Sequence, residues 1–378
     1  NHAQILTSIV EELDDECPHP DFPNPLLLLE EATTLFQQCL GIQEALLKDC
    51  IAQTIDDKET GDLMDVDLDD GGVSITNASS VHDNDSSVTR DECWATIIEP
   101  ITGNTILETI VASFETLTTY CHLITPQNSQ TLNEIQKFAQ KLNTRFESTL
   151  ADNNLLTEAY LTEAIYKCSF VTALLRCSLI NIPMSLQAID DAFADRCSDD
   201  NPRGLCEYAD ALLAHNNAIR IFSSEKEACQ NLNLRWKALT QALDYLSRAS
   251  KLSDIENVGK VHLARGDAEL SRYQLGQLER PLKVSFDNAK TLLINAVKYY
   301  RGSKKQAEIQ GLQTLATEAS LKEALALGLS GDTETLEKLA EVQKQEKNMI
   351  IKQSLEDGLI TPDQMRKISI DFRFLAAD

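Results

Sequence analysis

Apolar residues recur every three or four positions through most of the chain, which is the spacing of one face of an α-helix. Eight such rows cover residues 28–46, 106–124, 132–146, 161–179, 208–222, 232–246, 286–300 and 309–319. The first row places Cys39, Ile42 and Leu46 on the buried face of its helix. No stretch of useful length alternates apolar and polar residues with a period of two. The pattern therefore predicts an all-α protein.

Short polar breaks separate these rows. They contain the residues that begin or end helices, and they lie at 23–25, 126, 152–154, 199–202, 302–303 and 331–332. Because the connections are short, consecutive helices should lie antiparallel and stack in sequence order. About a dozen helices are too many for the core of one bundle, so a helical-repeat solenoid is favoured.

One segment breaks the pattern. Residues 56–92 contain twelve acidic residues against Lys58 and Arg90, a net charge of −10 in 37 residues. So polar a segment cannot bury enough apolar surface to offset the entropy of ordering it, and we predict that it is disordered. It divides the chain into N-terminal helices at 1–55, the acidic segment at 56–92 and a helical-repeat domain at 93–378. The segment is either a tolerated insertion or an arm whose carboxylates bind a basic partner. The binding carboxylates would be those of Asp62, Asp65, Asp67, Asp69 and Asp70.

The excess of acidic residues extends beyond this segment. The 378 residues include 59 Asp and Glu against 34 Lys and Arg, which gives a formal net charge of −25. Such a surface repels nucleic acid and anionic membranes, so neither is expected as the main partner. No apolar stretch reaches the length of about 18 residues that predicts a transmembrane helix. Glycine is scarce at 14 residues, which disfavours a doubly wound α/β enzyme, since that class uses glycine in its phosphate loops.

The ten cysteines form no Cys-x-x-Cys pair, and the six histidines add no zinc-finger spacing. Cys39, Cys50, Cys121 and Cys168 fall in the apolar rows, where a reduced thiol behaves as a small hydrophobic residue. We therefore expect reduced thiols rather than disulfides or a metal site, and a cytoplasmic or nuclear location. The first residue is Asn rather than Met, so a trimmed chain is expected.

The C-terminal half of the chain resembles tetratricopeptide repeats. Residues 262–276 look like the first helix of such a repeat, with the small residues Ala264 and Gly266. Residues 289–300 look like the second helix, with Tyr300 at a packing position. Small residues at these points let two helices approach closely, which is why the pattern recurs in repeat proteins.

The resemblance implies an irregular right-handed solenoid whose first helices line a concave groove that holds a peptide or an extended protein segment. In this chain those helices would present Glu207, Tyr208, Asp210, Asp267, Glu269 and Tyr273. Two features depart from the family pattern. Ala242 and Ala289 are 47 residues apart instead of the regular ~34, and the closing proline is missing. HEAT-like or irregular α-α packing therefore remains an alternative.

The chain contains no motif for catalysis or for a cofactor. It lacks the phosphate-binding loop, the dinucleotide fingerprint, the zinc-protease motif and the nucleophile elbow. The acidic run that begins at Asp65 lacks the glycine and the glutamate that a calcium loop requires. Cys121 and His122 are adjacent, but Cys121 lies in an apolar row and is predicted to be a core thiol. No catalytic, cofactor-binding or metal-binding residue is therefore assigned.

These features favour a non-catalytic binding protein. The chain is similar in outline to acidic chaperones of ribosomal proteins and of histones, and most of all to the histone-chaperone type in which an acidic segment interrupts a repeat. The similarity implies a groove that holds a segment of a basic client, with the acidic arm raising the encounter rate and shielding charge. The alternatives are a scaffold subunit or co-chaperone in a multiprotein complex, and an enzyme with dispersed carboxylates. No residue pattern selects the client or the oligomeric state.

Overall fold

The computed structural model describes residues 2–12, 24–59, 101–150, 153–178, 180–194, 201–222, 227, 230–252, 257–331 and 344–370. Of residues 50, 51, 53–59, 153, 154, 344–346, 369 and 370 it describes the backbone alone. Every regular element in these ranges is a helix, so the prediction of an all-α protein is confirmed for them. Most of the predicted acidic segment lies outside the described residues, and residues 56–59 continue a helix.

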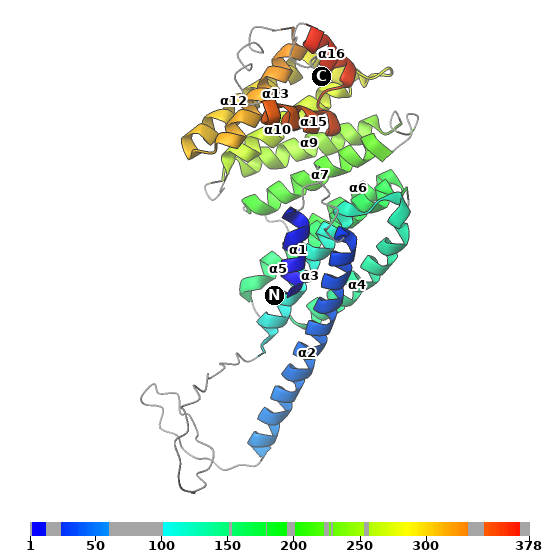
Figure 1. The fold of residues 1–378 in the computed structure, drawn as a ribbon, viewed down its shortest axis with the longest axis vertical. Helices are drawn as coiled ribbons and strands as arrows, with labels where there is room; N and C mark the ends of the chain where they lie inside the picture. Colours follow the sequence, from blue (N-terminus) through cyan, green and yellow to red (C-terminus); the bar gives the residue numbers. More distant parts are fainter. Residues whose placement is uncertain are drawn as a thin grey trace, which may run out of the picture.

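The described residues form fourteen α-helices and one short 3-10 helix (Figure 1). The N-terminal half contains α1 (His2–Glu12), α2 (Pro25–Glu59), α3 (Gly103–Leu123), η1 (Pro126–Asn128), α4 (Ser129–Ser148), α5 (Asn153–Arg176) and α6 (Ile182–Phe193). The C-terminal half contains α7 (Pro202–Phe222), α9 (Leu232–Ala249), α10 (Val258–Gln274), α11 (Lys283–Asp287), α12 (Ala289–Gln310), α13 (Gln313–Leu329), α15 (Lys344–Glu356) and α16 (Pro362–Ile370).

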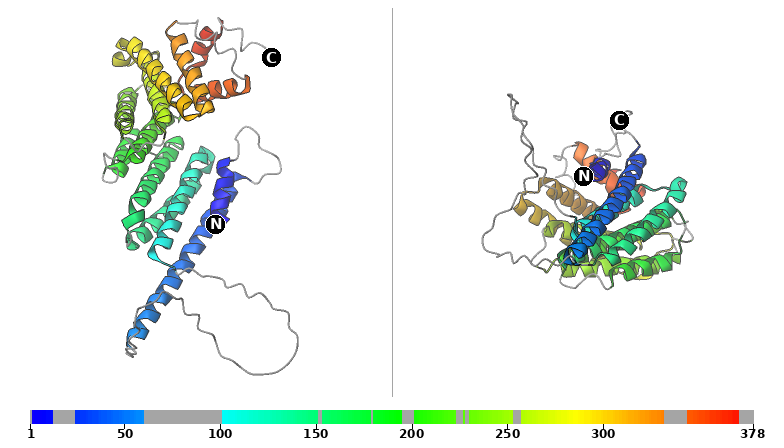
Figure 2. Two further views of the ribbon diagram at one scale, coloured as in Figure 1. Left: turned by 90° about the vertical axis from the view of Figure 1, so that its left-hand side faces the viewer. Right: turned by 90° about the horizontal axis from the view of Figure 1, so that it is seen from below.

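The helices stack largely in the order of the sequence. α2 packs on α1 and α3, α3 on α5, and α5 on α6 and α7. The series continues from α7 to α9, α10, α12 and α13. α2 and α3 run close to the long axis of the molecule, whereas α7 and α9 lie across it (Figure 1). The direction of the stack therefore changes between the two halves, and the far end of α2 projects beyond its neighbours (Figure 2).

Several helix boundaries follow from the residues at the breaks. α2 begins at Pro25 and α7 at Pro202, because the fixed φ of proline suits the first turn and its missing N–H is not needed there. Thr102 caps α3 by accepting a hydrogen bond from the N–H of Thr105 at 3.3 Å. α13 ends just before Gly331, whose φ of 90° favours glycine. The breaks predicted around these two prolines and Gly331 are confirmed.

The break predicted at Gly302 and Ser303 is wrong. α12 continues through both residues to Gln310, and the chain turns at Gly311, where φ is 72°. Gly311 takes the left-handed conformation that commonly ends a helix. The predicted row 286–300 is also split, because α11 and α12 meet at Asn288.

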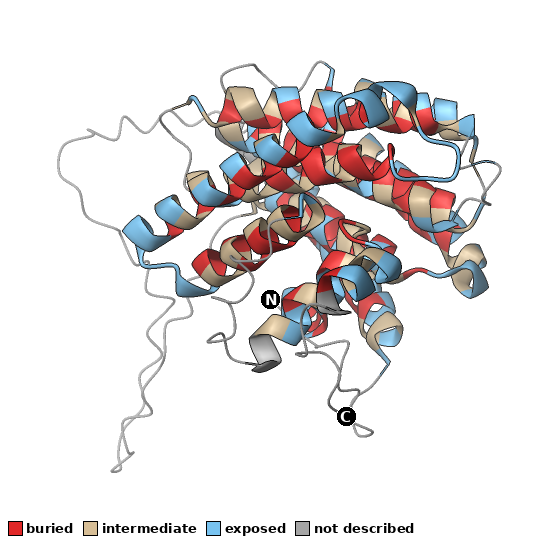
Figure 3. Ribbon diagram, turned by 90° about the horizontal axis from the view of Figure 1, so that it is seen from above, coloured by how far each residue is buried: buried red, intermediate tan, exposed pale blue. Residues whose placement is uncertain are grey.

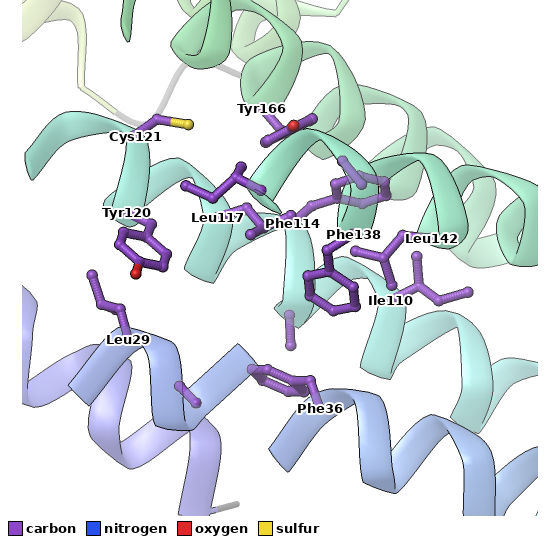
Figure 4. Packing of buried hydrophobic residues seen from close by; sticks show 14 of the residues in the cluster. Leu29, Phe36, Ile110, Phe114, Leu117, Tyr120, Cys121, Phe138, Leu142 and Tyr166 are labelled. Atoms are coloured by element: carbon purple, nitrogen blue, oxygen red, sulfur yellow. The ribbon is translucent and has the colours of Figure 1, made fainter. Parts of the chain in front are cut away.

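The largest hydrophobic cluster of the described residues joins α1, α2, α3, α4 and α5. Ile110 and Phe114 of α3, Phe138 of α4 and Phe36 of α2 are all buried in it. Figure 4 shows these side chains converging from neighbouring helices. The ring centroids of Phe114 and Tyr166 of α5 are 5.5 Å apart. Burial of large apolar side chains, at about 1.5–3 kcal/mol each, therefore holds these helices together.

The buried face of α2 differs from the predicted one. The residues that pack into the core are Leu29, Ala32, Phe36 and Leu40. Of the row predicted for that face, Ala32 is buried, and Leu28 and Leu35 are partly buried against the core. The second half of the row is exposed, namely Cys39, Ile42 and Leu46. Four consecutive leucines at 26–29 let the apolar pattern fit more than one face, and the positions of α1 and α3 decide between them.

A buried polar network joins α10, α12 and α13. The ring of Tyr300 is fully buried against the backbone of Gly266, and its hydroxyl donates a hydrogen bond to Asp267 at 2.8 Å. Lys322 donates to the second oxygen of Asp267 at 2.9 Å and pairs with Glu318 at 2.8 Å. Gly266 and Tyr300 therefore pack against each other, and both stand at positions that the sequence pattern singled out for helix packing.

Buried residues run in stripes along the helices and exposed residues cover their outer faces (Figure 3). This is the distribution that the apolar rows predict for helices with one packed face. Within the described ranges, no helix combines the length and the apolar character needed to cross a bilayer.

Candidate functional site

Two clefts meet at the first turn of α7. The first has a volume of about 730 Å³ and lies between α1, α3, α5 and α7. The second has a volume of about 460 Å³ and lies between α7, α9 and α10. Arg203 lines both clefts, so they form neighbouring parts of one surface. We call this surface the α1–α10 groove.

Successive helices each contribute a carboxylate to this groove. Glu11 of α1 and Glu115 of α3 line the first cleft, and Glu207 and Asp210 of α7 line the second. Glu158 of α5 joins them at the boundary, where its Oε1 lies 2.6 Å from Nη1 of the Arg203 guanidinium. The positive charges that line the two clefts are those of Arg203 and Lys260. The groove therefore carries more carboxylates than cations.

The pKa values of three of these carboxyl groups, Glu115, Glu207 and Asp210, are raised. Burial raises the pKa of Asp210 to about 6, with a further contribution from the negative charge of Glu207. Asp210 remains open to solvent at the mouth of the cleft but is surrounded by protein on its other sides. Burial likewise raises the pKa of Glu115, and the negative charges of Glu158 and Glu11 add to it. A pKa raised by burial and by neighbouring carboxylates means that the ionised form is disfavoured in the groove, so a cation entering the groove would stabilise it.

Hydroxyl groups line the first cleft between these carboxylates. The Oγ1 atoms of Thr7 and Thr116 are 2.8 Å apart, and Thr119 donates a hydrogen bond to Oε1 of Glu11 at 2.8 Å. Thr118 and Thr162 also line the cleft. A groove with both hydroxyls and carboxylates can bond to the N–H groups of an extended peptide and to its cationic side chains.

Two of the residues predicted to bind a partner on α7 line the groove, and the third does not. Glu207 and Asp210 line the second cleft, but Tyr208 is buried on the opposite side of the helix. The ring of Tyr208 stacks on Phe193 at a centroid distance of 4.5 Å, and its hydroxyl donates to Asp190 at 2.7 Å. Tyr208 is therefore a packing residue.

Of the predicted residues on α10, Glu269 and Tyr273 lie in the interior and Asp267 is partly buried. Glu269 is only 4% exposed, and it accepts hydrogen bonds from Arg272 at 2.9 Å and from Asn295 at 3.0 Å. Tyr273 is also buried, and Asp267 belongs to the polar network with Tyr300 and Lys322. These three residues were predicted to lie on the exposed groove surface of a first helix. They do not, because α12 and α13 pack over that side of α10.

The remaining predicted binding residues, Asp62, Asp65, Asp67, Asp69 and Asp70, lie outside the described residues. Five charged groove residues were missed in the sequence, namely Glu11, Glu115, Glu158, Arg203 and Lys260. Each occupies an ordinary exposed position of a helix. The sequence gives no signal for them, because residues of five helices become neighbours only when the helices stack.

Cys121, Cys168 and His215 pack within the fold, whereas Cys39 and His122 are exposed. Cys121 is fully buried, as predicted for a core thiol, and burial raises its pKa to about 12. His215 is fully buried with its Nε2 2.8 Å from the hydroxyl of Ser185, and burial lowers its pKa to about 4. Across the described part of the chain, no three His, Cys, Asp or Glu side chains gather in a way that could hold a metal ion.

Comparisons of the chain with models of known protein families, with curated proteins and with solved structures gave no match. The groove is therefore interpreted from its own geometry and charge.

Proposed function

We propose that this chain is a non-catalytic binding protein that captures a basic segment of a client protein in the α1–α10 groove and shields its charge. The observation that carries the proposal is the excess of carboxylates in the groove, together with the raised pKa values of Glu115, Glu207 and Asp210. Lysine and arginine side chains of a client would supply the missing positive charge. Ribosomal proteins and histones are the client classes that fit best, since both are rich in these residues.

The order of the helix contacts supports a solenoid-type arrangement for this function. Each helix packs mainly on the next ones in the sequence, so a groove can extend over several helices without a closed core. A tetratricopeptide-like solenoid remains our proposal for the family of folds. The acidic segment after α2 would add long-range attraction for the same client, because its charge has the same sign as that of the groove.

Removing two groove charges should weaken binding of a basic peptide. We expect the variant Glu207→Gln/Asp210→Asn to lose roughly tenfold in affinity for a labelled 12-residue lysine–alanine peptide, since each desolvated charge pair contributes on the order of 1 kcal/mol. Fluorescence anisotropy at constant ionic strength measures the change. The matched control is Glu30→Gln/Glu31→Gln, which removes two exposed charges from α2. Equal losses of affinity in both variants would show that only net charge matters and would contradict binding in the groove.

Binding of the same peptide should weaken as the pH falls through about 6. The pKa of Asp210 is raised to about 6, and a bound cation favours the ionised carboxylate, so binding below that pH must release a proton. Titration calorimetry in two buffers with different ionisation enthalpies measures the protons released. The Asp210→Asn variant should release fewer protons than the wild type. Identical release by the two proteins would contradict the assignment of this proton to Asp210.

A pull-down from cell extract separates the proposal from a scaffold function. One basic protein recovered in equimolar amount, and lost at moderate salt or on deletion of residues 60–91, is the expected result. A multi-subunit complex of ordinary charge that survives both changes would instead support a scaffold subunit or co-chaperone.

A further inference from the structure

The helix α12 is basic, although the chain as a whole carries a net charge of −25. It contains five positively charged residues and one negatively charged residue, Glu308. Four of the cations share one face with Ile294, because they follow one another in steps of three, four or eight. These four are Lys290, Lys298, Arg301 and Lys305, and all are exposed. We call this face of α12 the basic ridge.

The basic ridge borders a groove of about 900 Å³ between the end of α10, α12 and α13. Leu293, Val297 and Leu327 form part of its apolar lining, and Ile294 stands beside them with 57% of its surface exposed. Arg301 pairs with Glu323 of α13 at 2.6 Å. Within the described residues, neither Lys290 nor Lys298 forms an ion pair. The groove therefore combines an apolar lining with two cations at its edge that lack a counter-charge in the described fold.

We infer that this groove docks an acidic segment of a partner protein that also carries aliphatic side chains. The aliphatic side chains would cover Ile294 and the apolar lining, and the carboxylates would pair with Lys290 and Lys298. Nucleic acid fits less well, because a phosphate backbone has no use for the apolar lining and is repelled by the rest of the chain. The inference goes beyond the proposed function, since the α1–α10 groove is lined by other residues and has the opposite charge preference.

The test uses two synthetic peptides of 14 residues. In the first, leucines at helical spacing are separated by glutamates, and in the second every glutamate is replaced by glutamine. We expect the full-length chain to bind the glutamate peptide at least about tenfold more tightly than the glutamine peptide in fluorescence anisotropy. A 20-nucleotide single-stranded DNA serves as the third probe. Tighter binding of the DNA than of the glutamate peptide would overturn the proposal in favour of a nucleic-acid surface.

Two pairs of variants locate the binding. Lys290→Glu/Lys298→Glu should lose about tenfold in affinity for the glutamate peptide, whereas the control Lys137→Glu/Lys141→Glu on α4 should lose less than about twofold. Ile294→Ser should lose about fivefold, and Ile309→Ser, at an exposed position of α12 outside the groove, should change little. The four lysines replaced in the first pair of variants are all exposed, so the fold should tolerate the changes.

The remaining outcomes contradict the inference. Equal losses for test and control variants would show that the peptide responds to net charge alone. Failure of the glutamate peptide to bind would mean that the groove does not accept acidic segments. None of the variants touches the α1–α10 groove, so binding of the basic peptide there should be unchanged. The two proposals can therefore fail independently.

Discussion

Replacing Lys322 with methionine is expected to destabilise the protein by about 3 kcal/mol, the lower end of the usual cost of breaking a buried ion pair, because it leaves two partly buried carboxylates without their cation. Lys322 is 2% exposed and lies within 2.9 Å of Asp267 and 2.8 Å of Glu318. Burial alone would lower the pKa of Lys322, but these two carboxylates outweigh burial and hold the pKa above its usual value. The ion pairs are therefore strong enough to keep the ammonium charged in the interior. Urea unfolding followed by circular dichroism measures the loss.

The control for this prediction is Lys298→Met, which removes an exposed ammonium from α12 and should change the stability by less than about 0.5 kcal/mol. The double variant Lys322→Met/Asp267→Asn should recover part of the loss, because it also neutralises one of the stranded carboxylates. A loss below about 1 kcal/mol in the single variant would contradict the buried position of the network.

Replacing Gly266 with valine is expected to cost about 3 kcal/mol, the upper end of the usual cost of overpacking. A Cβ atom at this position would lie 2.6 Å from Cδ1 of Tyr300, and the other ring atoms are as close. The ring cannot move aside, since Tyr300 is fully buried and its hydroxyl is held by Asp267. α10 and α12 would have to separate, which would also disturb the network around Lys322. The same unfolding experiment measures the effect.

Gly41 provides the matched control for a helical glycine. It lies within α2, and a Cβ atom there would meet nothing within 4 Å. Gly41→Ala should therefore stabilise the protein by about 0.5–1 kcal/mol through better helix propensity. If Gly266→Val cost no more than an exposed substitution, the close approach of α10 and α12 would be refuted.

The sequence predicted the helices better than it predicted the surfaces. Apolar spacing and helix-ending residues suffice to place α7 at Pro202 and the end of α13 before Gly331, because both signals are local. The break at Gly302 failed for a local reason too, since a glycine ends a helix only when the chain needs a left-handed residue, as at Gly311. The buried side of α2 could not be predicted, because its leucines fit more than one face.

The groove was predicted only in part, for a reason that lies in tertiary packing. Glu207 and Asp210 were predicted to face a partner from one helix, and both line the second cleft, since their spacing is a local property. That they bind a partner stays a prediction. Glu269 is likewise an acidic residue predicted for the exposed side of its helix, yet α12 covers it. Glu115 and Arg203 join the groove because α3, α5 and α7 stack, and no local pattern carries that information.

The length of α2 has a consequence for the acidic segment that follows it. Among the residues of α2 whose side chains the structure describes, Leu47 is the last that packs on the hydrophobic core, and the helix continues from 48 to 59 over about 18 Å. A stretch this short is near the limit at which a helix persists without packing, and Asp56, Asp57 and Glu59 oppose the helix dipole at its C-terminal end. The helix–coil equilibrium of this tip should therefore be close to balance. A client that neutralised these three charges would shift it towards helix and so shorten the tether that carries the rest of the acidic segment.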